Sequence, residues 1–123
     1  MLYAILCYDD ETKVRAWSAA QDAAVMEKLG AVQEKLERKN KLGPVARLVP
    51  TTAAVTLRKS GEAVVLDGPF AETKEQLLGF YVIEADSMNE VLEIAKELGA
   101  ANPGVGAYEI RALKFFNGRG APG

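Results

Sequence analysis

The sequence contains no histidine and only one cysteine, Cys7. Histidine performs most acid–base chemistry near neutral pH, so any such step here must use another side chain. With one cysteine and no histidine, a zinc site built from these two residue types is excluded. The single cysteine cannot form an intramolecular disulfide either, which favours a reducing compartment. We expect Cys7 to be a small core residue, as buried free cysteines usually are.

An excess of basic residues and a long hydrophobic run are also missing. The 15 basic and 17 acidic side chains give a net charge of −2, which does not favour a nucleic-acid partner. No apolar stretch approaches the roughly 18–20 residues that a membrane span needs. The apolar start, residues 1–8, lacks the basic region and cleavage site of a signal peptide. We therefore expect a cytoplasmic protein with no membrane partner, and the composition implies no metal and no cofactor.

A chain of 123 residues is long enough for one domain with one modest core. We expect that domain to occupy residues 1–116. The remaining segment, 117–123, is rich in glycine and is expected to be a flexible tail.

Two segments have the spacing of amphipathic helices. Residues 13–39 carry apolar side chains at intervals of four, three and four, which define one helix face. These side chains are Val25, Leu29, Val32 and Leu36. The part before about Ala19 is open to being a separate short helix. The second helix is expected to begin at Ser87, with Glu90 completing a capping box, and to stop at Gly99.

Six segments have the composition of β-strands. They are 2–8, 45–49, 53–58, 62–66, 79–85 and 107–116. Ser60-Gly61 joins the third and fourth as a hairpin-type dipeptide. Treating that hairpin as an insertion leaves the order βαββαβ, which predicts an α+β, ferredoxin-like antiparallel sheet with both helices on one face. The other face then needs cover, and a second copy of the chain would provide it, so we expect a homodimer.

The run from Asp67 to Leu77 reads Asp-Gly-Pro-Phe-Ala-Glu-Thr-Lys-Glu-Gln-Leu, and Gly-Phe-Tyr-Val-Ile follows at 79–83. These runs closely resemble the signature of the DGPF-type proteins of the YCII-related family, within the dimeric α/β-barrel superfamily. The resemblance covers nearly the whole chain. It implies a ferredoxin-like fold, a homodimer and a cleft between helices and sheet. Some members are encoded beside alternative sigma factors. YCII-type relatives have been proposed as enzymes that use a His-Asp pair, of which this chain retains only Asp67 as a candidate.

The motif also has a direct physical interpretation. Gly68 permits unusual backbone angles, and Pro69 fixes its own φ. We expect Phe70 to anchor the loop in the core, in which case its truncation to alanine should cost about 3–5 kcal/mol. Thr73 and Gln76 have the spacing of a capping box.

Asp67 is the first candidate for a catalytic residue. A partly buried carboxylate at a strand end could act as a general base, or bind a cationic or hydroxylated ligand. The alternative is that it accepts amide hydrogen bonds from its own loop, as aspartate does in turns.

Other side chains are candidates for ligand binding. Glu72 and Lys74 could line a pocket mouth, or form a surface or intersubunit pair. An arginine on a sheet face could bind a carboxylate or phosphate, or could be exposed or lie at a dimer interface. The arginines concerned are Arg47, Arg58 and Arg111. Phe70 and Tyr81 complete the candidate ligand set, although packing is the more common role of strand aromatics such as Tyr3, Tyr8 and Tyr81.

Asp9 and Asp10 could bind a hard cation, but a helix start is the better interpretation.

Two functions follow. The first is a small-molecule-binding α/β dimer that could use Asp67 for acid–base catalysis. The second is a non-catalytic dimeric interaction or regulatory module, for which the resemblance suggests a link to sigma-factor-associated transcription control. The residues do not decide whether the protein is an enzyme.

Overall fold

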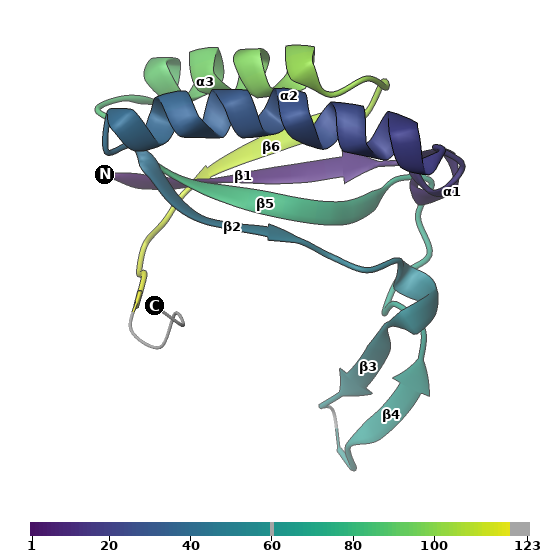
Figure 1. Ribbon diagram of the computed structural model, residues 1–123. Helices are drawn as coiled ribbons and strands as arrows, with labels where there is room; N and C mark the ends of the chain where they lie inside the picture. The colour runs from purple at the N-terminus through teal and green to yellow at the C-terminus, as the bar shows by residue number, and fades with distance from the viewer. Residues whose placement is uncertain (60, 119–123) are drawn as a thin grey trace.

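A computed structural model of the protein describes residues 1–59 and 61–118. Its main sheet contains four antiparallel strands in the order β2-β5-β1-β6. These strands are β1 (Leu2–Asp9), β2 (Leu42–Arg47), β5 (Gln76–Glu84) and β6 (Ala107–Ala112). Two helices, α2 (Ala19–Arg38) and α3 (Met88–Ala101), lie over one face of this sheet (Figure 1). The predicted α+β, ferredoxin-like fold is confirmed.

The core lies between the two helices and one face of the sheet. Tyr3 and Ile5 of β1 point to that face and pair with Ile83 and Tyr81 of β5. The helices contribute their apolar stripes, and Leu98 is fully buried. The stripe residues in the core are Val25, Leu29, Leu36, Val91, Ile94, Ala95 and Leu98. Burial of such side chains contributes about 1.5–3 kcal/mol each, which makes this face the main source of stability.

The segment after β1 forms two helices, as one of the two sequence interpretations allowed. The short helix α1 (Glu11–Arg15) begins at Asp10, whose side chain accepts a hydrogen bond from the backbone N–H of Thr12. Helix α2 begins at Ser18, which forms a capping box with Gln21. The chain leaves α2 through Asn40, whose φ of 57° is one that asparagine tolerates well at a helix end.

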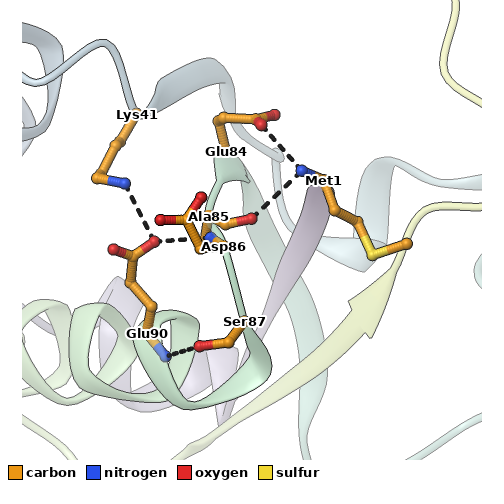
Figure 2. A network of polar contacts seen from close by, with 7 residues as sticks. All are labelled: Met1, Lys41, Glu84, Ala85, Asp86, Ser87 and Glu90. Carbon is orange, nitrogen blue, oxygen red and sulfur yellow. Dashed lines mark hydrogen bonds and ion pairs between the residues drawn. The ribbon is translucent and has the colours of Figure 1, made fainter.

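Helix α3 begins as predicted, because the Ser87 hydroxyl accepts a hydrogen bond from the Glu90 N–H. The Glu90 carboxylate does not close the expected box on Ser87. It accepts from the backbone N–H of Asp86 at 2.9 Å and from the Lys41 ammonium at 3.0 Å (Figure 2). The expected stop at Gly99 is wrong, since α3 continues to Ala101. A glycine inside a helix costs only about 1 kcal/mol, which the buried apolar face of α3 outweighs.

The same end of the molecule fixes the start of β1. The amino group of Met1 donates to the Glu84 carboxylate at 2.9 Å and to the Ala85 carbonyl at 3.3 Å (Figure 2). The network therefore joins β1 and β5 to the beginning of α3.

Residues 55–67 form the inserted hairpin, which we call the arm. It consists of β3 (Val55–Arg58) and β4 (Val64–Asp67), which pair only with each other and project away from the main sheet (Figure 1). The 3-10 helix η1 (Thr51–Ala53) precedes the arm. The hairpin is confirmed, although Ser60 of the predicted turn lies outside the described residues.

The base of the arm is held by hydrogen bonds. The Gly68 N–H donates to the Ala54 carbonyl at 2.7 Å, so the two ends of the arm lie side by side. Glu11, a buried carboxylate, accepts hydrogen bonds from the backbone N–H and the hydroxyl of Thr51. The Glu11 N–H donates to the side chain of Gln76 at 3.0 Å.

Several strand boundaries differ from expectation by one to four residues. Strand β2 begins at Leu42, before the expected start at 45, so Gly43-Pro44 lies inside it, where an edge position and a register shift before Val45 accommodate proline. Strand β6 ends at Ala112 and not at Phe116. Most of the expected tail, residues 119–123, lies outside the described part of the chain. Within residues 1–59 and 61–118, no helix combines the length and apolar character needed to cross a membrane.

Candidate functional site

A cavity of about 390 Å³ lies between α2, α3 and the helix-covered face of the main sheet. This volume falls within the range of about 300–1,000 Å³ that is typical of small-molecule sites. The strands contribute Cys7, Gly79, Tyr81, Tyr108 and Ile110, and the helices contribute Met26, Leu29, Gln33, Leu92, Ala95 and Gly99. Trp17, the only tryptophan of the chain, also lines the cavity. The lining is thus apolar and aromatic, with a few polar groups.

Burial keeps the Cys7 thiol and the Tyr81 and Tyr108 phenols neutral well above pH 7. It raises the pKa of the Cys7 thiol to about 12 and that of the Tyr81 phenol to about 12. The pKa of Tyr108 is also raised, chiefly by burial. A hydrogen bond from Gln33 partly offsets the effect at Tyr81. These groups can therefore exchange hydrogen bonds with a ligand, whereas a thiolate or phenolate nucleophile is not available.

One end of the cavity is rich in hydrogen-bond acceptors. The amide nitrogen of Asn102 donates to the Tyr108 hydroxyl at 3.2 Å. The amide oxygen of Asn102 is buried and accepts no hydrogen bond within the described residues. Asp9 lines the cavity too, and its charge contributes to the raised pKa of Tyr108. An unpaired buried acceptor of this kind costs about 1–3 kcal/mol, so a donor that reached it would be favoured.

Of the proposed ligand-binding residues, Arg47 and Tyr81 line this cavity. The Arg47 guanidinium forms a two-armed ion pair with Asp22 of α2, at 2.6 and 3.3 Å. The hydrogen bond with Arg47 lowers the pKa of Asp22, and the same bond raises the pKa of Arg47. Arg47 thus fastens edge strand β2 to α2 beside the cavity.

The other candidates do not line it. Arg58 and Asp67 lie on the arm, and Phe70, Glu72 and Lys74 follow in the exposed segment between β4 and β5. The loop amide of Gly68 donates to the Ala54 carbonyl, as described above. These five residues therefore lie on the arm or on the segment that follows it, and none of them lines the helix-covered cavity.

Two expectations for the motif are wrong. Phe70 is 74% exposed and does not anchor the loop in the core, because the loop follows the arm and lies away from the helix-covered face. Thr73 and Gln76 form no helix cap, since Gln76 begins β5. Its side-chain amide instead donates to the Thr73 carbonyl at 2.6 Å, which closes the loop locally.

Sequence reasoning missed Gln33, Asn102 and the cavity-facing role of Asp9. Asp10 is the helix cap of the Asp-Asp pair, whereas Asp9 lines the cavity. For Asp9, the available signal was its position at the end of a buried strand, where the chain turns into a helix. Gln33 lies beside the predicted stripe of α2, and Asn102 precedes Pro103-Gly104. Neither position carries a local pattern that distinguishes it from an exposed polar residue.

Comparison with known proteins places the chain in a family. Residues 1–117 match the YCII-related domain. A protein of Rhizobium meliloti (strain 1021), named "Uncharacterized protein R00369", is 60% identical over 117 residues, which cover 94% of each chain. The chain therefore belongs to the YCII-related family.

Proposed function

We propose that this domain binds a small, largely apolar molecule in the cavity between α2, α3 and the sheet. The observation that carries the proposal is the cavity itself, which combines a suitable volume, an aromatic lining and a few polar groups. Gln33 with Tyr81, and Asn102 with Tyr108, would orient the ligand by hydrogen bonds.

The chemistry available in one protomer is limited. The neutral thiol and phenols disfavour nucleophilic catalysis. Asp9 is the carboxylate that lines the cavity, so an acid–base step there would use Asp9. A catalytic role for Asp67 in the same cavity would need a second copy to bring its arm to the cavity mouth.

Filling the cavity tests the proposal. A Cβ on Gly99 of α3 would lie 3.8 Å from the Tyr108 ring, so the side chain of Gly99→Leu should occupy the cavity. Gly30 of α2 has no neighbour within 4 Å of an added Cβ, and Gly30→Leu is the matched control. Both replacements put a better helix former into a helix.

A thermal-shift screen against a metabolite panel supplies the ligand. A compound at 100 times its Kd stabilises the fold by about 2.7 kcal/mol and should raise the Tm clearly. We expect hits on the wild type and on Gly30→Leu, and none on Gly99→Leu. A hit that binds Gly99→Leu as tightly as the wild type would show that the ligand uses another site.

A second candidate function is a dimeric interaction module, and the arm is the observation that favours it. Val55, Leu57 and Val65 share one face of the hairpin and are 65%, 56% and 65% exposed. Exposed apolar side chains that gather on one face of a hairpin usually mark an interaction surface. We infer that a second copy of this chain covers it, in a homodimer.

A further inference from the structure

Charge is distributed unevenly among the residues that line the cavity. Two cations, Arg47 and Lys96, are engaged in ion pairs with Asp22 and Glu93, at 2.6 and 3.1 Å. The Lys96 pair lies on the exposed surface of α3, so its ammonium points to solvent. In the described part of the chain, by contrast, no cationic group lies within ion-pair distance of Asp9. The unmatched charge at the cavity is therefore negative.

The backbone holds the Asp9 carboxylate in a defined place. One oxygen accepts the N–H of Asp10 at 2.7 Å. The other faces the turn before β6, where a Cβ on Gly104 would lie 2.6 Å from it. A Cβ on Gly106 would lie 2.9 Å from the Asp9 side chain. A larger residue at 104 would displace the carboxylate, and Gly104 also has a φ of 127° that strongly favours glycine. At 106 an added Cβ would first meet the Tyr8 carbonyl oxygen, so the backbone itself requires glycine there.

The surroundings of Asp9 suit an organic cation better than a metal ion. Within the described residues no cluster of three metal-ligating side chains exists, and one carboxylate gives a divalent cation too few oxygen ligands. Tyr8 and Tyr108 supply aromatic rings at the cavity, and such rings attract ammonium groups. The Tyr108 hydroxyl, which accepts a hydrogen bond from the Asn102 amide nitrogen, is a further hydrogen-bonding group beside these rings.

Building on the proposed cavity-binding function, we propose that the ligand is a primary amine with an apolar body, whose ammonium binds the Asp9 carboxylate beside Tyr108 and Asn102. The apolar body would lie against the aromatic and aliphatic lining farther in. A carboxylic acid with the same body would be rejected, because Asp9 repels it and both lining cations already have partners.

Three compounds with similar bodies test this: 2-phenylethylamine, 2-phenylethanol and 3-phenylpropionate. Trp17 is the single tryptophan and lines the cavity, so its fluorescence reports the titration of each compound at pH 7. A charge-assisted hydrogen bond to a partly buried carboxylate should make the amine bind about tenfold or more tightly than the alcohol. The acid should bind most weakly.

Variants at two adjacent carboxylates identify the group responsible. Asp9→Asn keeps the size of the side chain and removes its charge, so the amine and the alcohol should then bind with similar Kd. Asp10→Asn is the matched control: Asp10 caps α1, and asparagine caps a helix about as well. We expect the amine preference to persist in Asp10→Asn.

The possible results separate the two proposals. Equal binding of amine and alcohol to the wild type, or a preference that survives Asp9→Asn, would overturn the amine assignment and leave cavity binding standing. Failure of all three compounds would also overturn it. The Gly99→Leu screen decides independently whether the cavity binds anything.

Discussion

Leu98 and Phe70 are both large apolar side chains, and the structure places them in opposite environments. Leu98 is fully buried between α3 and the sheet, while Phe70 is 74% exposed. Leu98→Ala should lower the free energy of unfolding by about 2–5 kcal/mol, and Phe70→Ala by less than about 1 kcal/mol. Urea denaturation at several protein concentrations measures both. A large loss for Phe70→Ala that grows with concentration would place this ring at a contact between copies.

The buried Cys7 thiol and Tyr81 phenol should make the fold less stable at alkaline pH. Folding raises the pKa of Cys7 from its ordinary 9.0 to about 12, and that of Tyr81 from 10.0 to about 12. Their contribution is complete below the ordinary values and is lost as pH rises from about 9 towards 12, because the unfolded chain then loses protons first.

Cys7→Ala isolates the contribution of the thiol. We expect the Tm of the wild type, kept reduced, to fall more steeply between pH 9 and 10 than that of Cys7→Ala, since only the wild type has a thiol to titrate. Identical slopes would mean that the folded thiol ionises as easily as the unfolded one.

At the scale of single residues, periodicity predicted most of the helix core. Val25, Leu29 and Leu36 are buried because they form one apolar face of the helix, and that face packs against the core. Phe70 shows the limit of such reasoning. Its burial depends on where the arm carries it, and no local pattern contains that information.

Among the elements, the two strands of the arm pair only with each other. The arm joins the rest of the chain at Ala54 and Gly68, whose backbones are hydrogen-bonded at 2.7 Å. Replacement of residues 55–67 by Gly-Ser-Gly should therefore leave the main sheet and its two helices folded, with little change in the helical signal of the circular dichroism spectrum. If the arm joins two copies, the variant should be monomeric while the wild type is dimeric.

Light scattering at micromolar concentration shows whether the wild type and the deletion variant are monomeric or dimeric. Leu57→Ser combined with Val65→Ser is a milder variant that keeps the hairpin and removes part of its apolar face. A monomeric wild type would contradict the homodimer, and a dimeric deletion variant would show that the contact lies elsewhere, for example on the uncovered sheet face.

Element boundaries were less predictable than element types. Gly99 carries the local signal of a helix end, yet α3 continues through it because its buried face continues to be packed. Gly43-Pro44 carries the signal of a loop but lies in β2, since an edge strand does not need every amide. At Gly99, tertiary packing outweighs a local preference of about 1 kcal/mol.

For the whole molecule, the order of strands and helices was enough to predict the fold, because few arrangements bury the apolar faces of a βαββαβ chain. The cavity was not predictable in the same way. It forms where residues of β1, α2, β5 and α3 that are distant in sequence come together. The raised pKa values of its thiol and phenols result from burial in that assembled core.

The arm has a further consequence for how the protein behaves in solution. Its two strands pair only with each other, so each has an outer edge with unpaired backbone groups, flanked by exposed apolar side chains. Such edges are templates onto which another chain can add a strand. In a destabilised sample we therefore expect strand addition between copies to begin at the arm.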